Sequence, residues 1–215
     1  MNADLIPTNP ITELSTYLYN HINTRYKTAL EKDFLIYQSF RDDVVAINYN
    51  LDIPNRPRKK DQRLVGTNFF VHIRSSTLVE PHARPMIINV CPKSDWHSNW
   101  RKTADDYKAI RRYCTKNNFG FAIYDESRIQ HQALSNIKHL MYYTAPFGLP
   151  SDASAILLQV EMMGITTIEY LLTRFFNGDL LRPYGEQLIM HLIATKRLGI
   201  DVWGDLNEKS EVWYV

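Results

Sequence analysis

Apolar and polar positions alternate along the chain with two different periods, which separate helical from extended segments. Apolar residues recur mostly at three- and four-residue steps from Thr12 to Phe40, and this spacing predicts a helix. Runs rich in β-branched and aromatic residues predict strands over 44–53, 67–73, 86–91 and 119–124. Two more helices are predicted over Thr103–Lys116 and Ser127–Tyr142, the first with Thr103 as its N-cap. This order favours the α/β class, with a mixed sheet flanked by helices.

The C-terminal part of the chain has a different pattern. Two prolines and a glycine interrupt it at 146–150, so we expect a domain boundary there, with domains 1–147 and 148–215. Beyond that point the pattern predicts three short helices, over Ser151–Met163, Thr166–Phe176 and Arg182–Thr195. Two strands follow, Leu198–Trp203 and Glu211–Val215, joined by a polar loop. Three helices and a β-hairpin predict a winged helix, a variant of the helix-turn-helix.

Composition narrows the class of protein further. The hydrophobic fraction is 45%, which is typical of a globular protein with a core. No stretch reaches the ~18 apolar residues that a membrane span needs, and the first residues lack the pattern of a secretory signal. Two cysteines, Cys91 and Cys114, are too few for a disulfide framework and fit free thiols. We therefore expect a soluble cytoplasmic protein without a membrane partner.

The net charge of +2 excludes a strong overall attraction to nucleic acid, so any DNA contact has to come from local patches. Two basic clusters are candidates for DNA binding. The first lies in a proline-broken loop and the second on one face of the helix predicted over 103–116. Their members are Arg56, Arg58, Lys59 and Lys60 in the loop, and Lys108, Arg111 and Arg112 on the helix. A solvated surface with ion pairs remains the alternative for both clusters.

Two further features concern partner binding. Trp96 and Trp100 lie four residues apart in a polar segment, and they are interface anchors if exposed and core residues if buried. The third C-terminal helix is poor in the arginine and lysine side chains that recognition helices use on DNA. The loop 205–209 carries more negative than positive charge, which repels phosphate. These observations favour a protein partner over DNA for the C-terminal domain, and both alternatives stay open.

The order of four short motifs resembles the TnsA-type endonuclease subunit of heteromeric cut-and-paste transposons, within the restriction-endonuclease-like superfamily. The resemblance covers almost the whole chain, including the expected winged helix, and depends on the ordered series rather than on any single motif. The motifs are Leu30-Glu31 with Asp42 and Val44-Val45 behind it, Gly66-Thr67-Asn68-Phe69-Phe70-Val71, Ile88-Asn89-Val90-Cys91, and Ile123-Tyr124-Asp125-Glu126-Ser127-Arg128-Ile129.

The resemblance implies a restriction-endonuclease-like fold and metal-dependent hydrolysis of DNA, in which carboxylates hold Mg²⁺ beside a lysine. Carried over residue by residue, Glu31 keeps the family's helix glutamate, whereas Phe69 stands at the strand aspartate. Asn89 stands at the glutamate or glutamine position and Cys91 at the lysine position. A single carboxylate holds Mg²⁺ poorly because the ion prefers its water shell. No catalytic residue set is therefore intact, and we expect no cofactor.

The first functional hypothesis is a catalytically inactive TnsA-like subunit that contacts a transposase, other transposition subunits and DNA, at transposon ends or target. The second is an active endonuclease with a site rebuilt from Glu31, Asn89 and Lys93, which would require Mg²⁺ or Mn²⁺. The third is a DNA-binding regulatory module built on the same scaffold. Cys91 with His72 or His97 is also considered as a nucleophile and base, against the alternative of a buried thiol.

Overall fold

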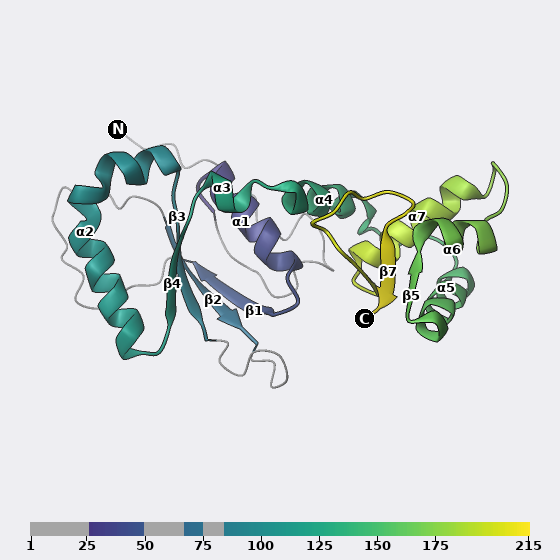
Figure 1. The fold of residues 1–215 in the computed structure, drawn as a ribbon, viewed down its shortest axis with the longest axis horizontal. Helices are drawn as coiled ribbons and strands as arrows, with labels where there is room; N and C mark the ends of the chain where they lie inside the picture. Colours follow the sequence, from purple (N-terminus) through teal and green to yellow (C-terminus); the bar gives the residue numbers. More distant parts are fainter. Residues whose placement is uncertain (1–25, 50–66, 75–83) are drawn as a thin grey trace. The chain divides into compact units, whose positions relative to one another are not determined.

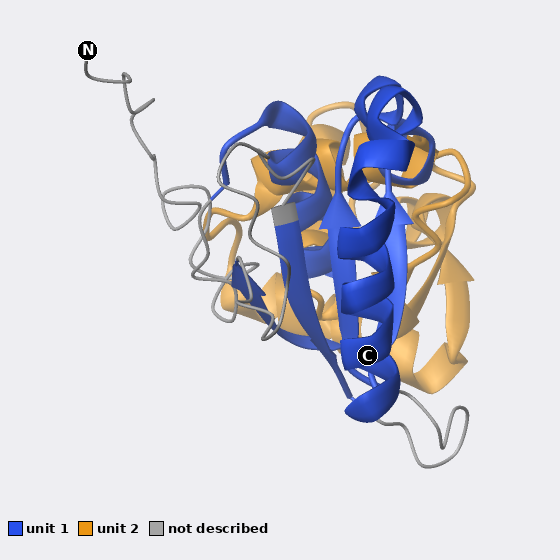
Figure 2. Ribbon diagram, turned by 90° about the vertical axis from the view of Figure 1, so that its left-hand side faces the viewer, with its two compact units in different colours: residues 1–13, 19–130 blue, residues 14–18, 131–215 orange. Residues whose placement is uncertain are grey.

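A computed structural model of the chain describes residues 26–49, 67–74 and 84–215. The described residues divide into two compact units, of which unit 1 ends at Gln130 and unit 2 comprises His131–Val215 (Figure 2). In these described ranges no helix is long and apolar enough to cross a membrane.

Unit 1 is built on a four-stranded mixed sheet with the order β1-β2-β3-β4 (Figure 1). Strands β1 and β2 and strands β2 and β3 pair antiparallel, whereas β3 and β4 pair parallel. Helix α1 lies on one face of this sheet and α2 on the other, which confirms the expected mixed sheet flanked by helices. The strands are β1 (Val44–Tyr49), β2 (Thr67–Ile73), β3 (Met86–Val90) and β4 (Gly120–Tyr124).

Helix α1 (Ala29–Phe40) begins at a side-chain cap, because the hydroxyl of Thr28 accepts a hydrogen bond from the backbone N–H of Glu31 at 3.2 Å. It packs on the sheet through Phe34, whose ring centroid lies 5.0 Å from that of Phe69. The earlier part of the helix predicted from Thr12 lies outside the described residues, as does the end of the first strand after Tyr49.

Helix α2 (Lys93–Lys116) starts well before the predicted Thr103, and this prediction of the helix start was wrong. Pro92 precedes the first turn with a fixed φ of −56°, and Asp95 supplies the acidic residue that the N-terminal dipole favours. Thr103 lies inside the helix, where its hydroxyl donates to the carbonyl of Asn99 at 3.0 Å. The first turns were missed because most of their side chains face solvent and leave no apolar stripe.

The helix predicted over 127–142 is broken into α3 (Glu126–Ile129), α4 (Gln132–Leu140) and a short 3₁₀ turn, η2 (Met141–Tyr143). Each α-helix has its own cap. The carboxylate of Asp125 accepts a hydrogen bond from the backbone N–H of Ser127, and the ring of His131 accepts one from Leu134. The break therefore coincides with the division between the two units.

Unit 2 contains a three-stranded antiparallel sheet with the order β5-β7-β6, together with helices that precede and separate its strands. Gly164, with φ of 76°, ends α5 as expected. The short strand β5 was not predicted, and the cap of α6 is Thr167 rather than Thr166. The elements are α5 (Pro150–Met163), β5 (Ile165–Thr167), α6 (Ile168–Phe175), α7 (Arg182–Ala194), β6 (Leu198–Ile200) and β7 (Glu211–Tyr214).

Helix α4 and the η2 turn belong to unit 2 through hydrogen bonds that a sequence pattern does not reveal. The side-chain amide of Asn136 donates to the carbonyls of Val202 and Gly204 at 2.8 and 2.7 Å. The His191 ring lies 2.8 Å from the carbonyl of Tyr143. The division therefore precedes the proline-containing segment 146–150, at which the sequence pattern placed the boundary between 1–147 and 148–215.

Replacement of Gly185 in α7 by alanine should destabilise unit 2. A Cβ at this position would lie 2.3 Å from Cδ2 of the buried Phe176 ring. Overpacking of about 1–3 kcal/mol exceeds the gain of about 0.5–1 kcal/mol in helix propensity. Urea denaturation should show the loss, whereas Gly204→Ala, whose Cβ meets nothing within 4 Å, should stay within about 0.5 kcal/mol of the parent. Equal stability of both variants would contradict this packing.

Unit 2 should also lose stability as the pH falls below about 6.5, the ordinary pKa of histidine. Burial lowers the pKa of His131, which caps α4 and stacks on Trp203 with ring centroids 4.4 Å apart. The unfolded chain therefore takes up the proton first, and the stabilisation present above that pH is lost below it. Thermal unfolding at about pH 7.5 and about pH 5.5 measures the effect. His131→Asn keeps a capping side chain and should flatten this dependence.

Candidate functional site

The register of β2 against β3 decides which motif residues share a face of the sheet. Asn68 lies opposite Asn89, and Phe69 lies opposite Ile88. Because successive side chains of a strand point to opposite faces, Phe69 and Asn89 lie on different sides of the sheet. The two positions that the resemblance assigns to neighbouring metal ligands are therefore not brought together. Asn68, rather than Phe69, is the neighbour of Asn89.

Phe69 belongs to the core on the α1 side. Its side chain is fully buried, and its ring centroid lies 5.0 Å from that of Phe34 and 5.7 Å from that of Tyr49. Glu31 lies one turn before Phe34 on the same helix and is buried, with its carboxylate accepting a hydrogen bond from the backbone N–H of Lys27 at 2.6 Å. Helix α1 therefore holds Glu31 on the opposite face of the sheet from Asn89.

A neutral hydrogen-bonded cluster occupies the α2 face at the motif strands. The side-chain amide of Asn89 donates to the side-chain oxygen Oδ1 of Asn68 at 3.0 Å. The Tyr107 hydroxyl donates to Oδ1 of Asn89 at 3.1 Å. Both asparagines are almost fully buried. We call Asn68, Asn89 and Tyr107 the amide–tyrosine cluster. It contains no carboxylate, and its hydrogen bonds satisfy buried polar groups that would otherwise be costly.

Asn68 and Tyr107 were missed at the sequence level, although one observation pointed to the first of them. Asn68 and Asn89 are buried polar residues in two otherwise largely apolar strands, TNFFVHI and MIINV. Buried asparagine in a strand needs a hydrogen-bond partner, so two such residues predict each other. Tyr107 comes from α2, and nothing in the sequence places it beside Asn89.

Cys91 shares this face, and its side chain is fully buried. Burial raises the pKa of Cys91 to about 11, although a hydrogen bond with the Tyr107 hydroxyl acts in the opposite direction. An activated cysteine has a lowered pKa. His72 lies 3.1 Å from the side-chain carbonyl oxygen of Asn48, and His97 stacks against Trp96. These observations favour the alternative of a buried thiol over a catalytic pair of Cys91 with His72 or His97.

The three residues of the site proposed as rebuilt, Glu31, Asn89 and Lys93, lie on three different elements, α1, β3 and α2. Lys93 begins α2 instead of extending β3, and its backbone N–H donates to the Glu126 carboxylate at 2.8 Å. Glu31 is carried by the helix on the other face of the sheet from Asn89. In the described ranges, no group of three or more histidine, cysteine, aspartate or glutamate side chains is arranged to hold a metal ion.

A depression of about 530 Å³ lies beside the amide–tyrosine cluster, between α2, β4 and α3. We call it the α2–β4 pocket. Tyr107 is common to both features, because its hydroxyl belongs to the cluster and its side chain lines the pocket. The lining combines three cations, one carboxylate and three aromatic side chains: Lys108, Arg111, Arg128, Asp125, Trp96, Tyr107 and Phe121, together with Ala104, Ala122 and Ile123.

The pocket unites residues that the sequence assigned to separate roles. Lys108 and Arg111 are candidates for DNA contact, and Trp96 for partner contact. Arg112 is exposed on α2 but does not line the pocket, whereas Arg128 from α3 was missed because it is distant in sequence. Trp100 also lies on α2, is 51% exposed and has the Arg101 guanidinium 5.3 Å from its ring centroid. The loop cluster Arg56, Arg58, Lys59 and Lys60 lies outside the described residues.

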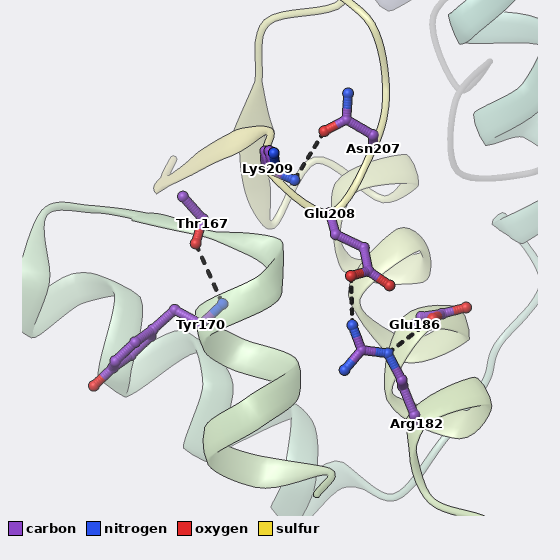
Figure 3. A network of polar contacts seen from close by, with 7 residues as sticks. All are labelled: Thr167, Tyr170, Arg182, Glu186, Asn207, Glu208 and Lys209. Atoms are coloured by element: carbon purple, nitrogen blue, oxygen red, sulfur yellow. Dashed lines mark hydrogen bonds and ion pairs between the residues drawn. The ribbon is translucent and has the colours of Figure 1, made fainter. Parts of the chain in front are cut away.

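In unit 2 the charged residues near α7 are used within the fold (Figure 3). Arg182, at the start of α7, forms ion pairs with Glu186 and with Glu208 of the loop before β7. Because the carboxylate of Glu208 is paired with the one arginine of α7, it repels phosphate less than an unpaired carboxylate would. His191, another polar residue of α7, lies against the Tyr143 carbonyl. Gln187, on the same helix, is exposed.

No model of a known protein family matches this chain, and no curated protein sequence matches it.

Both thiols should resist modification in the native protein. Cys91 and Cys114 are buried, and burial raises the pKa of each thiol. Reaction with a disulfide reagent near pH 8 should therefore be slow under native conditions, since the thiolate is the reactive form, and should reach two thiols per chain after denaturation. Rapid native labelling that disappears in Cys91→Ala would show an accessible, activated Cys91 and contradict this assignment.

Proposed function

We propose that this chain is a catalytically inactive TnsA-like subunit, which contacts DNA and protein partners as a structural component of a transposition complex. The observation that carries the proposal is the amide–tyrosine cluster. It places two neutral amides and a phenol on the strand pair where the resembled endonucleases place carboxylates. Neutral amides do not supply the anionic charge that holds a catalytic Mg²⁺.

The fold of unit 1 supports this assignment. Its mixed sheet, with α1 and α2 on opposite faces and a parallel β3–β4 pair, is compatible with a restriction-endonuclease-like domain. In unit 2 the order helix, strand, helix, helix, strand, strand, with a three-stranded antiparallel sheet, is compatible with a winged helix. Two buried free thiols fit a reducing compartment, so the proposal places the protein in the cytoplasm.

The proposed DNA contact lies on unit 1. Lys108 and Arg111 project from α2 beside Arg128 of α3, and the three cations outnumber the single carboxylate of the α2–β4 pocket. The ion pair of Lys108 with Asp105 joins two largely exposed side chains at 3.5 Å. Such exposed pairs contribute about 0–1 kcal/mol and do not prevent a phosphate contact.

The proposed protein contact lies on unit 2. The only arginine of α7 is held by two carboxylates, which leaves this helix without a cation for base edges. Apolar side chains are exposed instead. Ile165 and Trp213, which are register partners in the β5–β7 pair, are 58% and 37% exposed, and Met162 at the end of α5 is 76% exposed. An exposed apolar surface of this kind fits a protein partner better than DNA.

The absence of nuclease activity is tested with supercoiled plasmid DNA in the presence of Mg²⁺ or Mn²⁺. We expect no nicking above the level of buffer, and we expect Glu31→Ala to behave like the parent protein. Nicking that requires the metal and disappears in Glu31→Ala would overturn the proposal in favour of an active endonuclease. Calorimetry with Mn²⁺ on the same two proteins should show no binding that depends on Glu31.

The DNA contact is tested by binding to a duplex at several salt concentrations. Replacement of both Lys108 and Arg111 by alanine should weaken binding and reduce the slope of log K against log salt by about 1–2, because each phosphate contact contributes about 0.9. Lys209→Ala, in the loop of unit 2, is the matched control and should leave the slope unchanged. Unchanged duplex binding in the double variant would remove α2 from the DNA interface. Strong sequence preference by the protein alone would favour a regulatory DNA-binding module.

A further inference from the structure

The α2–β4 pocket has a composition that the proposed duplex contact does not explain. A surface that only follows a duplex backbone needs cations, whereas this pocket also has Trp96, Tyr107 and Phe121 in its lining. Its volume of about 530 Å³ lies within the range of about 300–1,000 Å³ that is usual for small-ligand sites. Aromatic side chains beside cations are the combination that proteins use to bind unpaired nucleotides, by stacking and by contact with phosphate.

The charges of the pocket favour an anionic ligand. Lys108, Arg111 and Arg128 contribute three positive charges, and Asp125 is the only acidic side chain in the lining. Burial alone raises the pKa of Asp125, but hydrogen bonds from Ser127 and Arg128 lower it overall, so this carboxylate is ionised. Its Oδ1 accepts hydrogen bonds from both the backbone N–H and the hydroxyl of Ser127, and it therefore serves as the cap of α3. The cations remain in excess by two.

The aromatic part of the pocket lies between α2 and β4. The ring centroids of Tyr107 and Phe121 are 6.0 Å apart, and both side chains are half-buried. Trp96, also half-buried, adds the largest ring and lies closer to the start of α2 than Tyr107. Half-buried rings are held by packing on one side and keep area for a ligand on the other. A base placed here stacks without regard to sequence, because every base has a π-face.

Strand β4 adds backbone polar groups to the cations and aromatic rings of the pocket. Three consecutive residues of β4, Phe121, Ala122 and Ile123, line the pocket. Among the described strands, β4 pairs with β3 and ends the sheet. The outer edge of such a strand presents backbone N–H and C=O groups. These groups can hydrogen-bond to the polar edge of a base, which distinguishes a nucleotide from a bare phosphate.

We infer that the α2–β4 pocket binds one unpaired nucleotide of DNA, with the phosphate at Lys108, Arg111 and Arg128 and the base against the aromatic side chains of Trp96 and its neighbours. This inference extends the proposed function, since it assigns the ligand of the same surface. The same chemistry is offered by a free nucleotide and by a nucleotide within a strand. Arg128 and Trp96 then both bind the ligand. A contact with a duplex backbone would not require Trp96.

The experiment compares the binding of two fluorescein-labelled single strands of equal length by anisotropy. One strand is oligothymidylate, and the other carries the same sugar–phosphate backbone without bases. The parent protein should prefer the strand with bases. Trp96→Ala should reduce that preference roughly tenfold, the order expected for one lost stacking contact, whereas Trp96→Phe should retain most of it. Arg128→Ala should weaken binding to both strands.

Arg112→Ala is the matched control, because Arg112 is exposed on the same helix and does not line the pocket. It should leave the ratio between the two strands unchanged. Thermal unfolding of each variant shows whether the fold is retained, and Trp96→Phe provides the test if Trp96→Ala unfolds. Competition by free thymidine monophosphate at comparable concentration would assign the site to a free nucleotide, and resistance to it would assign the site to a strand.

Equal binding of the two strands by the parent protein would overturn the inference, as would an unchanged ratio in Trp96→Ala. Either result is compatible with duplex binding through Lys108 and Arg111, so the inference can fail while the proposed function stands. Conversely, plasmid nicking that depends on Glu31 would overturn the inactive assignment without affecting the preference for bases.

Discussion

The antiparallel pairing of β2 with β3 is the constraint on which the rest of unit 1 depends. Its register sets Asn68 against Asn89 and Phe69 against Ile88, and thereby gives each face of the sheet its own chemistry. The face of Phe69 packs against Phe34 of α1 as an apolar core. The face of Asn89 receives Tyr107 of α2 and closes into a hydrogen-bonded cluster. A slip of one residue would exchange the two faces and leave the amides without partners in the apolar core.

This arrangement separates the features that a metal-dependent nuclease needs in one place. The acidic residue Glu31 lies on α1, the helix of the apolar face, whereas the amides lie on the opposite face. The two buried asparagines hydrogen-bond to one another, and Asn89 also accepts a hydrogen bond from the phenol of Tyr107, so neutral groups satisfy these polar atoms. The same helix, α2, carries Tyr107 into the cluster and Lys108 and Arg111 to the pocket beside it. A neutral cluster and a cationic surface therefore lie next to one another on α2.

Unit 2 shows a similar use of charge within the fold. Arg182 starts α7 and pairs with Glu186 and Glu208, which ties the loop before β7 to the helix (Figure 3). The backbone N–H of Glu169 at the start of α6 also donates to the carbonyl of Glu208, at 2.7 Å. Ion pairs between partly exposed groups add little to stability, but here they fix the position of a loop and neutralise the arginine of the helix. Unit 2 also exposes apolar side chains, among them Met162, Ile165 and Trp213.

The sequence by itself determined the class of the fold and most of its elements. The strands β2, β3 and β4 and the helices α5, α6 and α7 follow from local periodicity and from residues such as Gly164, whose positive φ ends α5. It failed at the start of α2, where a polar, exposed turn leaves no apolar stripe, and at the break between α3 and α4, which two caps create. The sequence also located polar residues on the motif strands but did not reveal their hydrogen-bond partners. Only the tertiary structure decided that Asn68 rather than Phe69 adjoins Asn89, that Tyr107 joins them, and that Trp96, Arg111 and Arg128 line one pocket. The reason is physical: periodicity records which face of an element is buried, whereas register and helix packing, which set the neighbours across elements, depend on contacts between residues far apart in the chain.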